Sequence, residues 1–295
     1  MFVPFRPHCA GSIPQKRHLP QSKSAVKRIE PFFSIREPVR TLCTNNMFAG
    51  LQKTTLINFP RRVAAAVFLP GCNMRCPYCH NAELAAAPAN GPINGSIVSG
   101  SNNYYTLDEI YAFLHKRKNL ISGLVISGGE PCMSPALIGL ITEAKKLHLQ
   151  VKIDTNGFFP EKLTEILGSA ELRPDMIAID IKTSLDRYIE LFPAMQEKHF
   201  AKLKKAFLQT LNILKNEDTT LETEYRTVLA PGLVTETEIK EIAALLPENA
   251  RWRLAPFVPG NCLNAAWNLI KPYTETQTVR LERLAAELVK DTALR

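Results

Sequence analysis

The segment VAAAVFLPGCNMRCPYCHN, from Val63 to Asn81, contains the two features on which the fold and the chemistry depend. Its first seven residues, 63–69, form a continuous apolar run, which is typical of a strand buried on both faces. The run ends at the turn-forming pair Pro70-Gly71, and three cysteines follow at once. The segment therefore predicts a buried strand whose carboxyl end leads directly into a cysteine-rich loop.

The same order of elements repeats along the chain after Met47. Short apolar runs rich in valine and isoleucine are followed by turns containing Gly, Pro or Asn and then by a helical pattern. The six predicted strands are 63–69, 124–127, 151–154, 176–181, 222–229 and 251–257. Helical connections imply parallel strands, and right-handed crossovers curl six such units into an open or partial barrel. We therefore predict an α/β fold, a partial (βα)6 barrel.

Helix starts are readable between these runs. Thr106 with Glu109, and Thr235 with Glu238, have the spacing of a capping box, and Pro135 occupies a position typical of a first helical turn. In parallel α/β folds the chemistry gathers at the carboxyl ends of the strands. The patterned sequences that follow the predicted strands are PGC at 70–72, SGGEP at 127–131, DTNG at 154–157 and DIK at 180–182. We expect these four stretches to meet.

The formal net charge is +8 over 295 residues. Most of the excess lies in residues 1–46, which contain eight Lys or Arg against two Asp or Glu. The remainder, 47–295, is close to neutral and has no basic cluster beside the strand ends, so nucleic acid binding is not expected. No run approaches eighteen consecutive apolar residues, so we predict a chain without a membrane span.

Residues 1–46 contain six prolines and no sustained periodicity, which predicts a disordered basic extension. Their Arg-rich, acid-poor composition weakly resembles a transit peptide, and they lack the apolar run of a secretory signal. Met47 stands where the patterned sequence begins, so a translation start there would leave the extension unmade. We predict one domain over 47–295, ending in a helical segment, in a reducing cytoplasm because the cysteine spacing suits ligands better than disulfides.

One short loop presents three thiols, those of Cys72, Cys76 and Cys79. Three thiolates can hold three irons of a [4Fe–4S] cubane and leave the fourth iron without a protein ligand. A zinc site completed by His80 is one alternative, but adjacent residues have difficulty reaching two corners of a tetrahedron. The other is an electron-carrying cluster, with Cys132 or Cys262 as fourth ligand. We expect these last two cysteines to be buried free thiols instead.

The spacing C-x3-C-x2-C, with the aromatic Tyr78 before the last cysteine, resembles the radical S-adenosylmethionine (SAM) superfamily. The stretch SGGEP at 127–131 resembles the GGE motif of that family and lies after the second predicted strand, as it does there. Two motifs in the correct order make coincidence a poor explanation. The resemblance implies a partial barrel of the radical SAM type, a [4Fe–4S] cluster and bound SAM.

The likeness extends from Met47 to about Asn264 and narrows the family. The opening GLQKTTLINFP at 50–60 resembles the anaerobic ribonucleotide reductase activating proteins, as do GCN, CHN and PGNC at 71–73, 79–81 and 259–262. At one position the sequence departs from a related branch of this family. Pyruvate formate-lyase activating enzymes place a histidine after the last of the strands, where this chain reads Phe257-Val258.

The resemblance also implies roles for residues around the cysteines. The open iron would chelate the amino and carboxylate groups of SAM, and Tyr78 would lie near its adenine. Gly128 and Gly129 would let the backbone approach the ligand, while Glu130 would accept hydrogen bonds from the methionine ammonium. For the two glycines, a tight turn is the alternative interpretation.

Five polar residues after two later strands match motifs of glycyl-radical activating enzymes: Asp154, Thr155, Asn156, Asp180 and Lys182. In those relatives these positions help arrange the SAM carboxylate and, in some, a monovalent cation. The alternative is that Lys182 only forms a salt bridge at the mouth of the barrel, with Asp180 or Asp154.

The resemblance therefore implies an activase that cleaves SAM reductively and takes hydrogen from a glycine of a partner enzyme. The expected partner is anaerobic ribonucleoside-triphosphate reductase, with a flavodoxin-like or ferredoxin-like protein as electron donor. Alternatives are a pyruvate formate-lyase type partner, a small-molecule or tRNA substrate, and a non-catalytic electron-transfer protein. We expect no side chain to serve as catalytic acid or base, because the cluster and SAM carry the chemistry.

Overall fold

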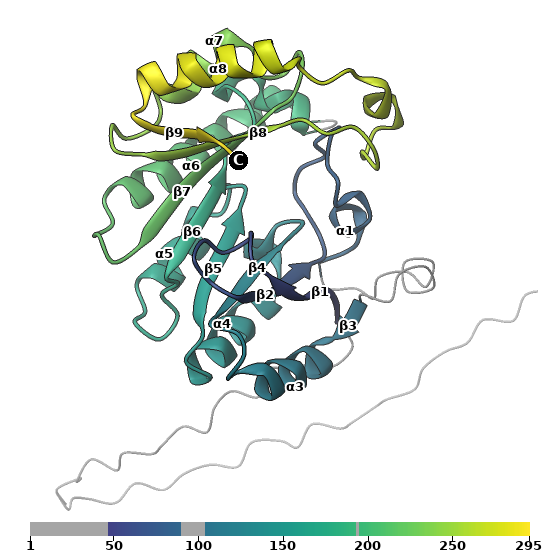
Figure 1. Ribbon diagram of the computed structural model, residues 1–295, viewed down its shortest axis with the longest axis vertical. Coiled ribbons are helices and arrows are strands. Elements are labelled where there is room, and N and C mark those ends of the chain that lie inside the picture. The colour runs from purple at the N-terminus through teal and green to yellow at the C-terminus, as the bar shows by residue number, and fades with distance from the viewer. Residues whose placement is uncertain (1–46, 90–103, 193–194) are drawn as a thin grey trace, which may run out of the picture. The chain divides into compact units, whose positions relative to one another are not determined.

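The computed structural model describes residues 47–89, 104–192 and 195–295, which belong to one compact unit, Leu42–Arg295. The predicted extension 1–46 lies outside the described residues. A nine-stranded sheet runs through the unit in the order β3-β1-β2-β4-β5-β6-β7-β8-β9 (Figure 1). Its strands are β1 (Phe48–Thr55), β2 (Ala64–Leu69), β3 (Tyr104–Thr106), β4 (Gly123–Gly128), β5 (Gln150–Thr155), β6 (Met176–Asp180), β7 (Glu222–Leu229), β8 (Arg251–Pro256) and β9 (Asp291–Leu294).

The six predicted strands are β2 and β4 to β8, and each of them pairs in parallel with the next. The prediction of a partial (βα)6 barrel is confirmed. Three further strands were not predicted: β1 pairs antiparallel with β2, β3 pairs antiparallel with β1, and β9 extends the other edge in parallel with β8. They escape a search for continuous apolar runs because β3 and β9 have only three and four residues and β1 is exposed in its second half.

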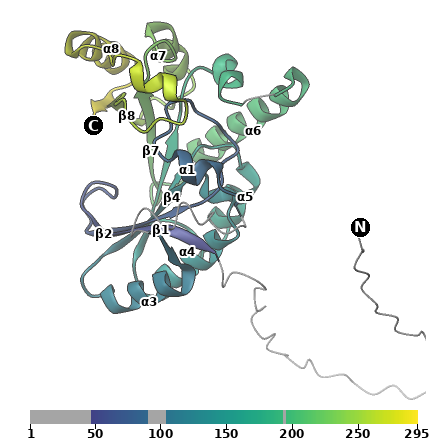
Figure 2. The same ribbon diagram turned by 90° about the vertical axis from the view of Figure 1, so that its right-hand side faces the viewer.

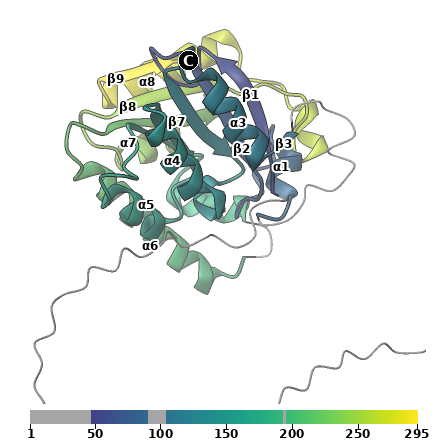
Figure 3. The ribbon, with the colours of Figure 1, turned by 90° about the horizontal axis from the view of Figure 1, so that it is seen from below.

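The helices are α1 (Ala82–Ala86), α3 (Leu107–Arg117), α4 (Ala136–Lys146), α5 (Pro160–Leu167), α6 (Glu197–Lys215), α7 (Glu236–Ala243) and α8 (Glu275–Leu288). Figures 1 and 2 together place α1 on the other side of the strands from α5 and α6. Seen from below in Figure 3, α3, α4, α5 and α6 follow one another along the sheet. The residues after α8 form β9, so the C-terminal segment is a helix followed by a strand.

The helix starts follow the sequence. Both predicted capping boxes are present, at Thr106 for α3 and at Thr235 for α7. Pro135 is the residue immediately before the first turn of α4. That helix buries Leu137, Leu140, Ile141 and Ala144. This spacing of three, four and seven residues places one apolar stripe against the sheet.

The parallel strands β2, β4 and β6 are buried on both faces, as their composition predicts. Ala64 to Val67 of β2, Leu124 to Ile126 of β4 and Ile177 to Ile179 of β6 are all at most 1% exposed. The helices cover one face of these strands, and the loop that follows β2 lies on the other with α1 (Figures 1 and 2). In the described part of the chain, no helix is long and apolar enough to cross a membrane.

Candidate active site

A pocket of about 430 Å³ lies at the carboxyl ends of β4 to β8, beside the loop that follows β2. It brings together residues from distant parts of the chain because parallel strands present these ends at one edge of the sheet. The predicted site residues that line it are Cys72, Cys76, Tyr78, Cys79, Gly128, Gly129, Asp154, Thr155, Asn156, Asp180 and Lys182. Glu130 does not line the pocket, and Arg226, which was not predicted, does.

The cysteine loop, residues 70–81, is held by its own side chains and by a distant segment. The Arg75 guanidinium donates to the carbonyls of Cys72 and Met74 at 2.7 and 2.8 Å. Two backbone amides after β8 complete the support, since Leu263 donates to the Cys79 carbonyl at 3.1 Å and Asn264 donates to the Pro77 carbonyl at 2.9 Å. The loop is therefore fixed by hydrogen bonds within it and by the segment that follows β8.

The three thiols of this loop are free and face one pocket. Burial raises the pKa of the Cys76 thiol to about 12 and also raises the pKa of Cys72. Both thiols are therefore protonated until a metal displaces the proton. Among the described residues, no three His, Cys, Asp or Glu side chains converge on a single metal position. A cubane does not need that convergence, since each of its irons takes one thiolate.

The alternatives for the cysteines are less compatible with the structure. A ring nitrogen of His80 lies 2.7 Å from the Val258 carbonyl, so one nitrogen of the ring is engaged away from the thiols. Cys132 and Cys262 are buried and free, as predicted, and neither lines the pocket. The Cys132 sulfur contacts the Thr155 hydroxyl instead, at 3.7 Å.

Gly128 and Gly129 line the pocket, but their lack of a side chain is required mainly by the fold. Gly128 has a φ of +125°, and a Cβ there would lie 2.3 Å from backbone atoms of Leu69. A Cβ on Gly129 would lie 2.1 Å from the carbonyl oxygen of Gly71. The two glycines let the end of β4 pack against the start of the cysteine loop. This close packing of two backbone segments accounts for the missing side chains without any ligand, and a contact of either glycine with SAM stays a prediction.

Glu130 lies behind the wall of the pocket and is fully buried. Its Oε1 accepts hydrogen bonds from the Cys132 amide at 3.0 Å and the Thr155 hydroxyl at 2.8 Å. Its Oε2 accepts one from the Asn156 amide at 2.7 Å. These bonds hold the loops after β4 and β5 together. In the structure Glu130 is a positioning residue, and its expected contact with an ammonium group stays a prediction.

Five charged side chains from β5, β6 and β7 and the residues that follow them form a continuous series inside the barrel. Lys152 pairs with Asp154 Oδ1, and Arg226 donates from Nη1 to Asp154 Oδ2 at 3.2 Å. Arg226 Nε bonds Asp180 Oδ1 at 2.7 Å, and Lys182 Nζ bonds Asp180 Oδ2 at 3.2 Å. Three cations face two carboxylates, which leaves one positive charge in excess. The salt bridge between Lys182 and Asp180, which was the alternative interpretation of Lys182, is present. Lys182 also lines the pocket.

The series keeps both carboxylates ionised. Burial alone would raise the pKa of Asp180, but Arg226 and Lys182 hold it well below its ordinary value. Burial also tends to raise the pKa of Asp154, but the nearby Arg226 and Lys152 lower it below its ordinary value. Arg226 was missed because a lone arginine in an otherwise mixed strand, ETEYRTVL, carries no motif. Its position opposite Asp180 in the register of β6 and β7 becomes visible only in the fold.

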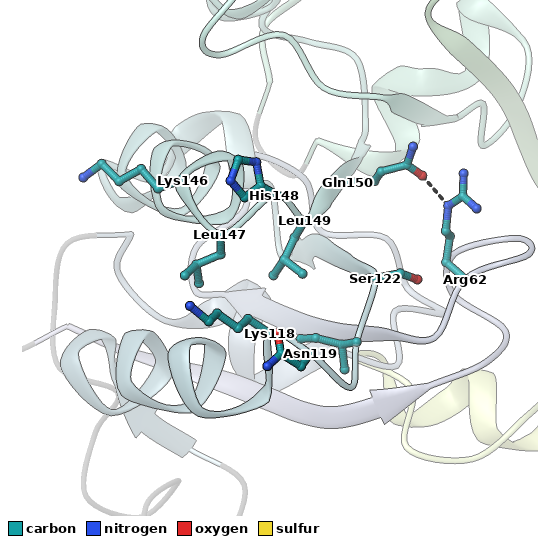
Figure 4. Close-up of a pocket in the computed structure, with 10 residues that line it drawn as sticks. Arg62, Lys118, Asn119, Ser122, Lys146, Leu147, His148, Leu149 and Gln150 are labelled. Carbon is teal, nitrogen blue, oxygen red and sulfur yellow. Dashed lines mark hydrogen bonds between the residues drawn. The ribbon is translucent and has the colours of Figure 1, made fainter.

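A second pocket lies at the other end of the strands (Figure 4). Lys118, Lys146 and His148 line it, and Arg62 donates to the Gln150 side chain across one side. None of these groups is buried, and none of the motifs predicted from the sequence reaches it. The pocket at the carboxyl ends is therefore the candidate active site.

Comparison with known families decides the identity of this site. The family model described as the radical SAM superfamily matches residues 66–246, which contain most of β2, the whole cysteine loop and the strands up to β7. The chain belongs to the radical SAM superfamily. It is a radical SAM enzyme, and members of this superfamily use a [4Fe–4S] cluster and SAM.

Three curated relatives show how far the likeness extends. A protein of Methanocaldococcus jannaschii, provisionally named a glycyl-radical enzyme activating enzyme, is 26% identical over 250 residues, which are 84% of this chain and 95% of that protein. The pyruvate formate-lyase-activating enzyme of Clostridium pasteurianum is 29% identical over 41% of this chain and 46% of its own. A GTP 3′,8-cyclase of Alkaliphilus metalliredigens is 31% identical over 41% of this chain and 35% of its own.

A solved structure has the same fold. The complex of Streptococcus suis SuiB with its precursor peptide SuiA superimposes with a TM-score of 0.51 at 17% identity, over 78% of this chain and 48% of that chain. The match covers about half of that longer chain and supports the fold alone.

The residues of the pocket fit a radical SAM site. The three free thiols of one loop are the donor set of a cubane with one open iron. Tyr78 lines the pocket, and its buried hydroxyl has no hydrogen-bond partner among the described residues, so a bound ligand can supply one. The excess positive charge beside Asp180 suits the carboxylate of SAM.

The monovalent cation that the resemblance implies does not fit. Both oxygens of Asp154 already bind side-chain cations, Lys152 on Oδ1 and Arg226 on Oδ2. A sodium or potassium ion on this carboxylate would have to displace one of them.

Proposed function

We propose that this radical SAM enzyme generates a glycyl radical on a partner enzyme, and that the partner is anaerobic ribonucleoside-triphosphate reductase. Cys72, Cys76 and Cys79 would hold the cluster, which would supply the one-electron reduction of SAM that leads to hydrogen abstraction from the partner. The protein side chains bind and orient SAM and exclude water around it. A flavodoxin-like or ferredoxin-like protein would supply the electron.

The size and position of the pocket carry this proposal. At about 430 Å³ the pocket lies near the low end of the range for ligand sites, so a cluster and SAM leave little room for a second small molecule. The substrate must then approach through the mouth at the strand ends. An extended glycine-containing loop suits that entry because glycine adds no side-chain bulk.

The relatives support the general class. The M. jannaschii protein matches over 95% of its length, so the likeness includes the parts of the chain outside the common barrel. The cyclase matches over only 35% of its length. The choice of ribonucleotide reductase over pyruvate formate-lyase depends on the sequence around the site, because Phe257 and Val258 line the pocket where the pyruvate formate-lyase branch has histidine.

The proposal is tested anaerobically, with reconstituted enzyme, a chemical reductant, SAM and the ribonucleotide reductase of the same organism. Electron paramagnetic resonance should detect a glycyl radical on the reductase, and the Cys76→Ala variant is the control without a cluster. The rate should depend weakly on salt because the body of the enzyme is nearly neutral. A radical formed only on another glycyl enzyme would refute the choice of partner. Turnover with GTP or tRNA and with no glycyl partner would refute the whole class.

A further inference from the structure

A buried lysine lies beside the site and has no part in the proposed reaction. Lys152 stands two residues before Asp154 on β5, so both side chains lie on the inner face of the strand. The Lys152 side chain is 0% exposed and does not line the pocket, whereas Asp154 is 12% exposed and does. Lys152 therefore supports Asp154 from the side away from the ligand.

Core packing does not explain a lysine at this position. Its neighbours in register are Val125 on β4 and Met176 on β6, both buried and apolar. An apolar residue of similar length would pack between them, and replacing a buried ion pair with apolar residues is often stabilising. Lysine is almost never fully buried unless it is paired. The charge of Lys152, rather than its bulk, is the property that the site uses.

The surroundings leave Asp154 as the target of that charge. Glu224, on β7, is the other buried carboxylate near Lys152, and it is paired with Arg295 at 3.4 Å. The Arg226 guanidinium pairs with both Asp154 and Asp180. Without Lys152, Asp180 would keep both Arg226 and Lys182, whereas Asp154 would keep only the Arg226 guanidinium on Oδ2. Oδ1 of Asp154 would then be open to a cation from solution.

We propose that Lys152 is a built-in substitute for the monovalent cation of related enzymes, so that this enzyme binds SAM without sodium or potassium. The ammonium neutralises Asp154 and thereby keeps Arg226 in place at the wall of the pocket. Lys152 is a positioning residue, because it acts through Asp154 and Arg226. The proposal depends on membership of the radical SAM superfamily and does not depend on the identity of the partner enzyme.

The test measures SAM binding to the reconstituted holoenzyme by equilibrium dialysis, with no partner present. Binding is compared in tetramethylammonium chloride, whose cation is too large for a carboxylate site, and in potassium or sodium chloride of equal ionic strength. The dissociation constant of the wild type should change by less than about twofold between these salts. A wild type that loses affinity without sodium or potassium would overturn the proposal.

The Lys152→Met variant keeps the length of the side chain and removes its charge. Its affinity for SAM should fall by about tenfold in tetramethylammonium and recover in potassium. In sodium chloride, the Lys152→Met variant should broaden the sodium-23 resonance of the buffer, whereas the wild type should leave that resonance unchanged. The matched control is Lys145→Met, which removes a lysine from an ion pair at the end of α4, 2.7 Å from Asp175 and outside the pocket. It should behave as the wild type in every salt.

A purely structural role for Lys152 predicts a different pattern. Lys152→Met would then bind SAM equally in all salts and leave the sodium resonance unchanged, and that result would overturn the proposal. Cation-dependent binding by the wild type overturns the proposal whether or not the variant folds.

Discussion

Removing the guanidinium at the centre of the charge series should destabilise the protein strongly. Arg226 is 19% exposed and bonds Asp180 at 2.7 Å and Asp154 at 3.2 Å. Breaking a buried ion pair costs about 3–5 kcal/mol because the remaining charge is left uncompensated. Each carboxylate keeps one lysine partner, Lys152 or Lys182, so we expect the lower end of that range for Arg226→Met.

The assay is urea unfolding of the cluster-free protein under reducing conditions, followed by far-ultraviolet circular dichroism. The matched control is Arg61→Met, since Arg61 is 68% exposed and pairs with Glu222 at 2.9 Å on the surface. The control should change the free energy of unfolding by less than about 1 kcal/mol. An Arg226→Met variant within about 1 kcal/mol of the wild type would show that the series contributes little, and the reasoning would be wrong.

The effect should also depend on pH in a definite direction. Arg226 lowers the pKa of Asp180 in the folded protein, so this pair stabilises the fold above the unfolded pKa of about 4. The stabilisation is lost as the pH falls from there toward the lower folded pKa. The difference between the wild type and Arg226→Met should therefore be largest near neutral pH and shrink below about pH 4.

Three further predictions concern the pocket. Changing any cysteine of the loop to Ala should remove a cluster of about four irons, as measured by iron analysis and visible absorption, whereas Cys132→Ala and Cys262→Ala should retain it. Tyr78→Phe removes a buried hydroxyl without a partner, so it should stabilise the SAM-free protein by about 1 kcal/mol. The same change should weaken SAM binding about fivefold, and unchanged binding would count against a contact between the Tyr78 hydroxyl and SAM. Gly129→Ala places a Cβ 2.1 Å from the Gly71 oxygen and should lower the free energy of unfolding by at least about 3 kcal/mol, whereas a stable variant would refute the close approach.

Much of this site could be predicted from the sequence because its residues follow strands that are easy to recognise. Strands β2, β4 and β6 are buried on both faces and consist mainly of apolar residues, and the stretches that follow β2, β4, β5 and β6 carry motifs. Parallel pairing then brings those stretches to one edge, so predicting the strands also placed Cys72, Asp154 and Asp180 together.

The parts that could not be predicted depend on side-chain direction and long-range pairing. Arg226 has no local signal, and its partners lie on two neighbouring elements 46 and 72 positions earlier in the chain. Glu130 belongs to a recognisable motif, but only the fold shows that its carboxylate points into backbone amides rather than the pocket. The antiparallel β1 and the edge strand β9 are defined by their neighbours more than by their own composition.

A glycine α-carbon in a partner protein is the proposed source of the hydrogen that this radical SAM enzyme takes. The direct measurement uses ribonucleotide reductase labelled with deuterium at the glycine α-carbon, mixed anaerobically with reduced enzyme and SAM. Mass spectrometry should find one deuterium in the 5′-deoxyadenosine formed, in step with the glycyl radical signal on the reductase. Unlabelled 5′-deoxyadenosine, formed at the same rate with or without the reductase, would contradict the claim.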